Sequence, residues 1–92
     1  MRLKNQVAYI TGASSGIGLA AAQRIAAEGA TAILIGRNAS RLAIAASQCH
    51  GRGHIVELDV TNRQAIDELI PNAITTYGKP DIVVHAAGET VL

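Results

Sequence analysis

The sequence predicts an α/β fold in which helices cover both faces of a parallel, doubly wound β-sheet. Two observations lead to this fold class. Short apolar runs alternate along the 92 residues with longer segments whose apolar residues have helical spacing. Apolar residues make up 49% of the chain, yet its aromatic residues are two tyrosines, so the core must be aliphatic. An aliphatic core suits buried parallel strands, and this length allows one domain at most.

The first apolar run, Val7–Thr11, predicts a strand that is covered on both faces. The alanine-rich segment behind it predicts a helix over residues 16–28, which Ser14 or Ser15 can cap through its hydroxyl. Gly29 stands where a glycine commonly ends a helix. The apolar residues at helical spacing, expected to be buried, are Ile17, Ala21 and Ile25.

A second apolar run predicts a strand over residues 31–35. We expect Asn38 or Ser40 to open the helix that follows, and Gly51 to close it. The side chains expected to face inward from this helix are Leu42, Ala45, Ala46 and Cys49.

A third run predicts a strand over residues 54–58, and Thr61 and Gln64 have the spacing of a capping box for the next helix. That helix is expected to end at Tyr77. Its apolar positions are Ala65, Ile66, Leu69, Ile70, Ala73 and Ile74.

Pro71 lies inside this third helix. Proline removes a backbone donor and clashes with the carbonyl four residues earlier, here that of Asp67, at a cost of about 3 kcal/mol. We therefore expect a kink between these two residues or a helix broken into two pieces. The last apolar run predicts a strand over residues 81–85.

The resulting order, β-α-β-α-β-α-β, predicts a Rossmann-like parallel sheet with strand order 3-2-1-4, truncated after the fourth strand. Right-handed crossovers place the first two helices on one face and the third helix on the other. Ligands bind such sheets where the strand order reverses, outside the carboxyl ends of the strands. The crevice beside the first and fourth strands is therefore the predicted ligand site.

A glycine-rich turn joins the first strand to the first helix. Its sequence is Thr11-Gly12-Ala13-Ser14-Ser15-Gly16-Ile17-Gly18. Gly12 can adopt the backbone angles of a sharp turn, Gly16 lets backbone N–H groups approach a pyrophosphate, and Gly18 lets the helix lie close to its strand. The anion would rest on the positive end of the helix dipole. A plain strand-to-helix turn is the alternative interpretation of these glycines alone.

A short sequence motif follows each of the four predicted strands. The motifs are Thr11-Gly12-x-x-x-Gly16-x-Gly18, Gly36-Arg37, Asp59-Val60 and Ala86-Ala87-Gly88. Together they resemble the short-chain dehydrogenase/reductase family, and so does the segment Tyr77-Gly78-Lys79-Pro80-Asp81 that leads into the fourth strand. The resemblance spans essentially the whole chain but covers the first half of the family's pattern.

The resemblance implies a nicotinamide dinucleotide site. Asp59 corresponds to the acid that accepts a hydrogen bond from the adenine amino group, and Val60 would supply a backbone contact and a contact with the adenine ring. The residues implied at the pyrophosphate and adenosine ribose are Gly12, Ser14, Ser15, Gly16, Ile17 and Gly18. Those implied beside the ribose and nicotinamide are Ala86, Ala87 and Gly88. A turn residue or helix-start acid is the alternative for Asp59.

Arg37 bears on the choice of cofactor. An acidic residue after the second strand would hold the 2′-hydroxyl of NAD, but Gly36 occupies that place and Arg37 follows. A guanidinium can bind a phosphate through two charge-assisted hydrogen bonds. We therefore expect NADP(H) to be favoured over NAD(H), with Ser14 assisting, unless Arg37 is an ordinary solvated loop residue.

Two departures from the family's pattern stand out. The family often has Asn-Asn-Ala-Gly after its fourth strand, whereas this chain has His85-Ala86-Ala87-Gly88. His85 either replaces part of an asparagine's hydrogen bonding or packs at the strand end. The family's proton-transfer residues include Tyr-x-x-x-Lys, and neither Tyr9 nor Tyr77 has a lysine at the fourth following place. No catalytic residue and no metal ligand is therefore assigned, and both tyrosines are interpreted as packing residues.

These features predict the cofactor-binding part of an oxidoreductase that transfers hydride between nicotinamide and a carbonyl or alcohol substrate. The alternatives are a non-catalytic dinucleotide-binding module and a fragment without independent activity; an epimerase or dehydratase on a related fold is a weaker rival. A net charge of +1 favours neither nucleic acid nor membrane as a partner, and the single cysteine fits a reducing cytoplasm. We expect a small-molecule substrate, a homo-oligomer if the protein is complete, and an open fourth-strand edge in 92 residues alone.

Overall fold

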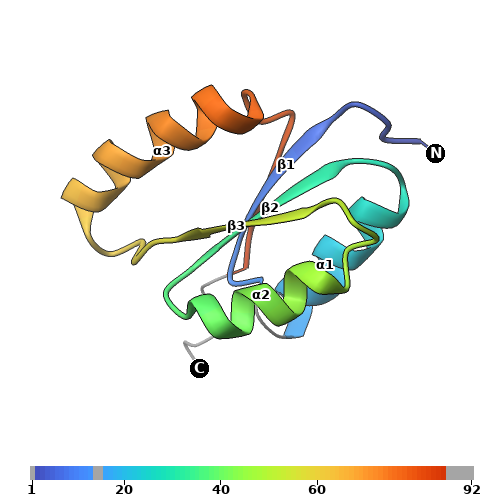
Figure 1. Ribbon diagram of the computed structural model, residues 1–92, viewed down its shortest axis with the longest axis horizontal. Helices are drawn as coiled ribbons and strands as arrows, with labels where there is room; N and C mark the ends of the chain where they lie inside the picture. The colour runs from blue at the N-terminus through green and yellow to red at the C-terminus, as the bar shows by residue number, and fades with distance from the viewer. Residues whose placement is uncertain (1, 14–15, 87–92) are drawn as a thin grey trace.

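The computed structural model describes residues 2–13 and 16–86 and contains one sheet with helices on both faces (Figure 1). Strands and helices alternate along the chain as predicted. They are β1 (Val7–Thr11), α1 (Gly16–Ala27), β2 (Thr31–Gly36), α2 (Ala39–Ser47), β3 (Gly53–Glu57), α3 (Arg63–Tyr77) and β4 (Ile82–His85). The strand order is β3-β2-β1-β4 and all pairs are parallel, which confirms the predicted Rossmann-like topology.

The pairing register aligns the carboxyl ends of the strands. The last residue of β1, Thr11, lies opposite Ile35 of β2 on one side and His85 of β4 on the other. Gly36 at the end of β2 lies opposite Glu57 at the end of β3. The loops that follow the strands therefore all start from the same edge of the sheet.

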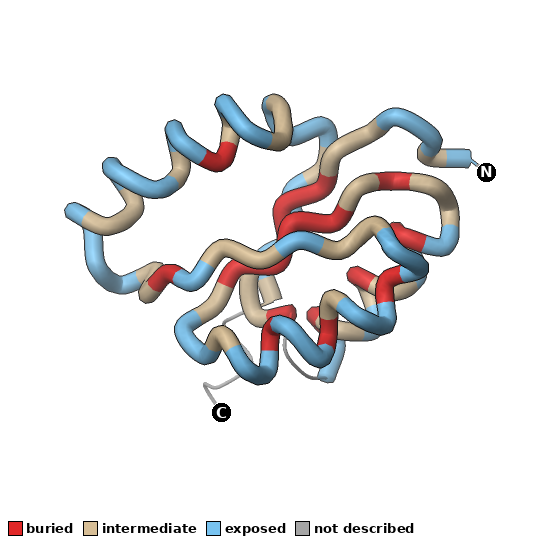
Figure 2. Tube along the Cα trace, viewed as in Figure 1, coloured by how far each residue is buried: buried red, intermediate tan, exposed pale blue. Residues whose placement is uncertain are grey.

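Two apolar layers hold the sheet between its helices. One layer joins Ala8, Ile10 and Leu34 of the sheet to α1 and α2. The other joins Tyr9, Ile33 and Ile35 to α3, which confirms that the first two helices share a face and the third covers the other. The most continuous burial runs along β1 and β2 in the middle of the sheet (Figure 2).

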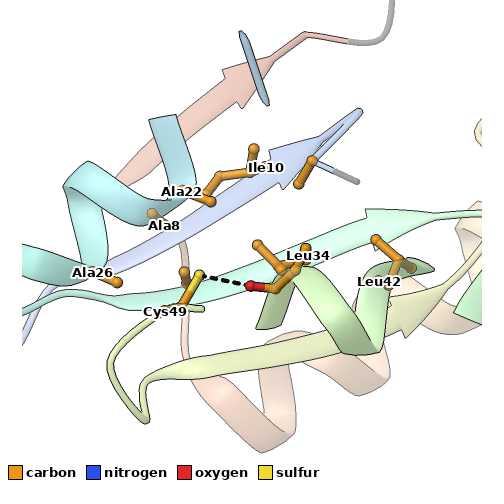
Figure 3. Packing of buried hydrophobic residues seen from close by; sticks show 10 residues of the cluster. Ala8, Ile10, Ala22, Ala26, Leu34, Leu42 and Cys49 are labelled. Carbon is orange, nitrogen blue, oxygen red and sulfur yellow. Dashed lines mark hydrogen bonds between the residues drawn. The ribbon is translucent and has the colours of Figure 1, made fainter. Parts of the chain in front are cut away.

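The buried stripe of α1 differs from the prediction by one residue. The buried positions are Gly18, Ala22 and Ala26, whereas Ile17 is 77% exposed and Ala21 and Ile25 are half-buried. The reason is the closeness of the helix to the sheet, where Ala22 and Ala26 lie beside Ala8 and Ile10 (Figure 3). Small residues permit that approach, so the largest aliphatic residues do not mark the contact face.

The ends of the first two helices follow local chemistry. Gly29 has a φ of 102°, and its N–H and that of Ala30 donate to the carbonyls of Ala26 and Ile25, which confirms the predicted glycine stop. Asn38, one of the two predicted candidates, caps α2 by accepting a hydrogen bond from the N–H of Arg41 at 3.0 Å.

The helix α2 ends at Ser47, so the prediction that it extends to Gly51 is wrong. His50 and Gly51 have φ values of 56° and 76° and turn the chain into β3. Cys49 lies beyond the helix but is buried, and its thiol donates to the carbonyl of Ala45 at 3.4 Å (Figure 3). Burial raises the pKa of this thiol, which is consistent with a packing role.

For α3 the expected capping box and one of the two alternatives for Pro71, a broken helix, are wrong. The cap is Asn62, which accepts a hydrogen bond from the N–H of Ala65 at 3.1 Å, whereas the hydroxyl of Thr61 donates to Asp59 and is not part of a capping box. The helix is also one continuous element through Pro71 and is not broken in two (Figure 1). The carbonyl of Asp67 receives no helical hydrogen bond, because Pro71 has no N–H to donate. Asp67 and Pro71 are both exposed, so this carbonyl lies on the solvent side of the helix.

The outer strands differ by one residue from the expected bounds: β3 is shifted by one residue toward the N-terminus, whereas β4 starts one residue later and ends at His85 as expected. β3 begins at Gly53, where a Cβ would lie 2.7 Å from the carbonyl oxygen of Ala46, so α2 contacts the strand directly at its first residue. β4 begins at Ile82 because Asp81 is used as an anchor. The N–H of Asp81 donates to the carbonyl of Val7 at 2.8 Å, and its carboxylate accepts from the N–H of Val7 at 2.9 Å.

Tyr9 and Tyr77 both pack in the apolar layer on the α3 face of the sheet. Tyr9 is buried, and its hydroxyl donates to the carbonyl oxygen of Gly78 at 2.7 Å. Burial, with a further contribution from Tyr77, raises the pKa of Tyr9. The ring of Tyr77 lies against that of His54, with ring centroids 4.9 Å apart.

Replacing Tyr9 with phenylalanine is expected to lower the free energy of unfolding by about 1 kcal/mol, because the carbonyl of Gly78 loses a buried donor. Tyr77→Phe is the matched control, since it also removes a phenolic hydroxyl but keeps the ring against His54. Urea unfolding of both variants measures the difference. Equal destabilisation by the two substitutions would contradict this account of Tyr9.

Candidate cofactor site

The turn between β1 and α1 depends on glycine at several positions. Gly12 and Gly16 have φ values of 71° and 62°, in the left-handed region that favours glycine. A Cβ on Gly18 would overlap the carbonyl group of Gly12, with its carbon at 2.6 Å, and would lie 3.0 Å from Cα of Ala13. The start of α1 is therefore folded directly onto the turn. Ser14 and Ser15, also assigned to this site, lie outside the described residues.

The first turn of α1 opens the site toward solvent. Gly16 and Ile17 are exposed, and among the described residues outside its chain neighbours and its own helix backbone, no atom lies within 4 Å of the place where a Cβ on Gly16 would stand. The first N–H groups of a helix have no partner inside the helix, and the helix dipole is positive at this end. An anion can therefore reach the backbone here without meeting a side chain at Gly16.

A pocket lies at the end of β2. It is lined by Arg37, Asn38, Ala39, Ser40, Arg41 and Glu57. Arg37 is exposed at this edge, so its side chain is accessible to a ligand. Arg41, on the first turn of α2, is a second arginine among the lining residues, and Glu57 lines the pocket from β3.

Arg41 and Glu57 were not predicted as site residues from the sequence. Arg41 could be placed near Arg37 only once the start of α2 was known. The helix is capped by Asn38 and begins at Ala39, so Arg41 falls in its first turn. Glu57 enters because the end of β3 pairs with the end of β2. Two positive charges and one negative charge at this pocket suit a ligand that carries a phosphate beside hydroxyl groups.

Asp59 is the second residue after the end of β3. It is half-buried, and its carboxylate is hydrogen-bonded to Thr61. One carboxylate oxygen, Oδ1, accepts hydrogen bonds from the N–H of Thr61 at 2.9 Å and from its hydroxyl at 2.6 Å. These two bonds, with a smaller contribution from the positive charge of Arg37, lower the pKa of Asp59 despite partial desolvation. Val60 packs against the α3 layer of the core rather than standing free at the edge.

The lowered pKa makes Asp59 a source of pH-dependent stability. A carboxyl whose pKa is lower in the folded protein stabilises the fold above its unfolded pKa, and this stabilisation is lost as the pH falls through the folded pKa. The difference in urea midpoint between the wild type and Asp59→Asn should therefore shrink below about pH 4. Thr61→Val removes the hydroxyl donor but keeps the N–H donor. Its urea midpoint should therefore differ from that of the wild type with a weaker dependence on pH than the midpoint of Asp59→Asn. A gap between the wild type and Asp59→Asn that is constant with pH would contradict the assignment.

The end of β4 is bonded to the end of β1. The N–H of Ala86 donates to the carbonyl of Thr11 at 3.1 Å, and Nδ1 of His85 lies 2.9 Å from the hydroxyl oxygen of Thr11. The structure thus gives His85 a hydrogen-bonding partner at the strand end. Ala86 is half-buried, while Ala87 and Gly88 lie outside the described residues.

The carboxyl edge of the sheet therefore brings together the glycine turn, Arg37, Asp59 and Ala86. Within residues 2–13 and 16–86, no group of three or more His, Cys, Asp or Glu side chains could hold a metal ion. In the same part of the chain, no helix has the length and apolarity needed to cross a bilayer.

Comparison with known proteins agrees with this topology. Residues 6–92 match the family model described as short chain dehydrogenase. The chain belongs to the short-chain dehydrogenase family. For a short-chain dehydrogenase, the carboxyl edge described above is where the nucleotide cofactor is expected.

Relatives of this short-chain dehydrogenase chain are found among both sequences and solved structures. An uncharacterized oxidoreductase of Staphylococcus epidermidis is 41% identical over 90 residues, which cover 98% of this chain and 39% of the relative. L-sorbose reductase from Gluconobacter frateurii, solved with NADPH and L-sorbose, has a TM-score of 0.79 and 36% identity over 90% of this chain and 34% of its own. A metagenomic short-chain oxidoreductase solved with NADP has a TM-score of 0.85 and 27% identity, covering 90% of this chain and 39% of its own. The chain thus spans between about a third and two fifths of the length of these relatives.

Proposed function

We propose that this chain supplies the cofactor-binding part of an NADP(H)-dependent oxidoreductase. The observation that carries the proposal is the juxtaposition, at one sheet edge, of the glycine turn and a pocket lined by two arginines. The turn suits a pyrophosphate because Gly18 allows α1 to start directly on it and Gly16 leaves its backbone uncovered. The bound cofactor supplies the chemistry, a hydride carried between nicotinamide and a carbonyl or alcohol carbon.

The preference for NADP(H) over NAD(H) rests on charge. Arg37 and Arg41 would bind the 2′-phosphate through charge-assisted hydrogen bonds, with Ser14 assisting. Gly36 leaves no carboxylate at the place from which an acid would hold a 2′-hydroxyl and repel a phosphate. The NADPH and NADP bound by two of the solved relatives support the same preference.

The remaining site residues have separate roles in this proposal. Asp59 would accept a hydrogen bond from the adenine amino group through Oδ2, since Oδ1 is already engaged by Thr61. Val60 would contribute its backbone, because its side chain packs into the core. Ala86, with Ala87 and Gly88, would form the wall beside the ribose and nicotinamide.

A non-catalytic dinucleotide-binding module is the second candidate. It is favoured by the positions of the two tyrosines, because the hydroxyl of Tyr9 is committed to Gly78 in the core and the ring of Tyr77 lies against His54. Neither belongs to a Tyr-x-x-x-Lys motif. We accordingly propose that these 92 residues alone bind the cofactor without turning it over.

The wider setting follows from the same proposal. A small-molecule alcohol or carbonyl compound would be the substrate, and the whole protein would act as a homo-oligomer in the cytoplasm. Size-exclusion chromatography with light scattering tests the oligomeric state directly.

The test of function is a hydride-transfer assay on the protein as its source produces it. NADPH oxidation is followed with a panel of ketones and aldehydes, and NADP reduction with the corresponding alcohols. Turnover with at least one substrate supports the oxidoreductase. Saturable NADPH binding without turnover across the panel would favour the binding module, and absence of binding would contradict both candidates.

A further inference from the structure

We propose that His85 is a positioning residue that fixes the glycine turn against the end of β4 and thereby strengthens NADP(H) binding. The inference rests on the proposed function, because it concerns the same cofactor site. It adds a role for a residue at which this chain departs from the asparagine often present in the family.

Thr11 and His85 are register partners at the ends of two adjacent parallel strands. Their side chains meet, with Nδ1 of His85 2.9 Å from the hydroxyl oxygen of Thr11. One residue further, the N–H of Ala86 donates to the carbonyl of Thr11 at 3.1 Å. Side chain and backbone of Thr11 are therefore both bonded to the end of β4.

These bonds lie where the two sides of the crevice begin. Thr11 directly precedes Gly12, whose φ of 71° starts the turn. Ala86 directly follows β4 and begins the segment proposed to wall the nicotinamide side. The contact of Gly18 with Gly12 and Ala13 holds the α1 side of the turn, and the bonds of Thr11 to β4 hold the point at which the turn leaves β1. A turn already held in place loses less conformational entropy when the cofactor binds.

The chemistry of the bond explains why histidine can replace asparagine here. In the Nε2–H tautomer of a neutral imidazole, Nδ1 accepts a hydrogen bond from the hydroxyl of Thr11. The Oδ1 atom of an asparagine at position 85 would be attached through the same Cβ–Cγ geometry and could accept the same bond. Leucine would place a methyl group there and could not.

Two matched pairs of variants test the proposal. His85→Asn and Thr11→Ser keep the bonding atoms, whereas His85→Leu and Thr11→Val replace them with methyl groups. The dissociation constant of NADPH is measured by fluorescence titration on the protein as its source produces it. The temperature is kept below the unfolding midpoint of every variant, as checked by thermal melts.

We expect His85→Leu and Thr11→Val each to weaken NADPH binding about three- to tenfold, and the bond-keeping variants to stay within about twofold of the wild type. Combining the two methyl substitutions should weaken binding no more than either alone, because both remove one shared bond. A ¹⁵N spectrum of His85 should show the Nε2–H tautomer.

Three results would overturn the inference while leaving cofactor binding intact: equal losses for His85→Asn and His85→Leu, additive losses in the double variant, or lower melting temperatures with unchanged NADPH affinity. If the wild type itself fails to bind NADPH, the proposed function fails and this inference fails with it. The wild-type titration therefore separates the two failures.

Discussion

Gly18→Ala is expected to lower the free energy of unfolding by about 3 kcal/mol or more. A Cβ at this position would overlap the carbonyl group of Gly12, with its carbon at 2.6 Å, and would lie 3.0 Å from Cα of Ala13. Both neighbours are backbone, so no side-chain rotation can relieve the overlap, and α1 would have to move away from the sheet. The stability of a small domain is only about 5–15 kcal/mol, so the loss is a large fraction of the total. Urea unfolding followed by circular dichroism measures it.

Gly16→Ala is the matched control because, in the described part of the chain, its added Cβ would have no atom within 4 Å apart from its chain neighbours and its own helix backbone. Its φ of 62° costs an alanine about 1–2 kcal/mol, which is a strain of the residue's own backbone alone. The order of destabilisation is therefore expected to be Gly18→Ala above Gly16→Ala. A Gly18→Ala variant as stable as Gly16→Ala would show that α1 does not pack on the turn as described.

Arg37→Ala should weaken NADPH binding about 10- to 100-fold and leave NADH binding within about twofold, because a hydrogen bond to a charged group contributes about 1.5–3 kcal/mol. The selectivity arises because the 2′-phosphate is the group by which the two cofactors differ. Competition by adenosine 2′,5′-bisphosphate isolates this subsite from the rest of the dinucleotide. Isothermal titration with each ligand gives the affinities.

Arg63→Ala is the control for a change of net charge. Arg63 is an exposed arginine at the start of α3, where its Nε lies 3.6 Å from Oδ1 of Asp67, and it does not line the pocket of Arg37. It should leave both cofactor affinities unchanged. Equal losses for NADPH and NADH in Arg37→Ala, or an equal loss of NADPH affinity in Arg63→Ala, would contradict a specific 2′-phosphate contact.

The sheet was predictable because its signals are local and strong. Each strand is an apolar run bounded by polar residues or glycine, and right-handed crossovers leave few ways to order four parallel strands. Gly29 and Asn38 were predictable for the same reason, since a helix stop and a cap each depend on one residue's own chemistry.

Features that depend on how closely a helix packs on the sheet, or on which of two neighbouring side chains caps a helix, were not predictable. The contact face of α1 consists of Gly18, Ala22 and Ala26, and periodicity weighted by apolar size selects Ile17 instead. Thr61 has the spacing of a helix cap, but its hydroxyl is bonded to Asp59 and Asn62 takes the cap. These choices are decided by competition between neighbouring groups, and that competition does not appear in spacing.

The candidate site shows the same division. The glycine turn, Arg37 and Asp59 follow from their places after predicted strands. The part played by Arg41 depends on where α2 begins, and the bond between His85 and Thr11 depends on a register that only the paired strands define.

The most direct test of a cofactor site at the carboxyl edge of the sheet is an amide-resolved NMR titration of the protein with NADPH. We expect saturable shifts concentrated at Gly12, Gly16, Arg37, Asp59 and Ala86, which lie on different elements but share this edge. An absence of saturable shifts, or shifts concentrated at the opposite end of the sheet around Gly78, would contradict the account.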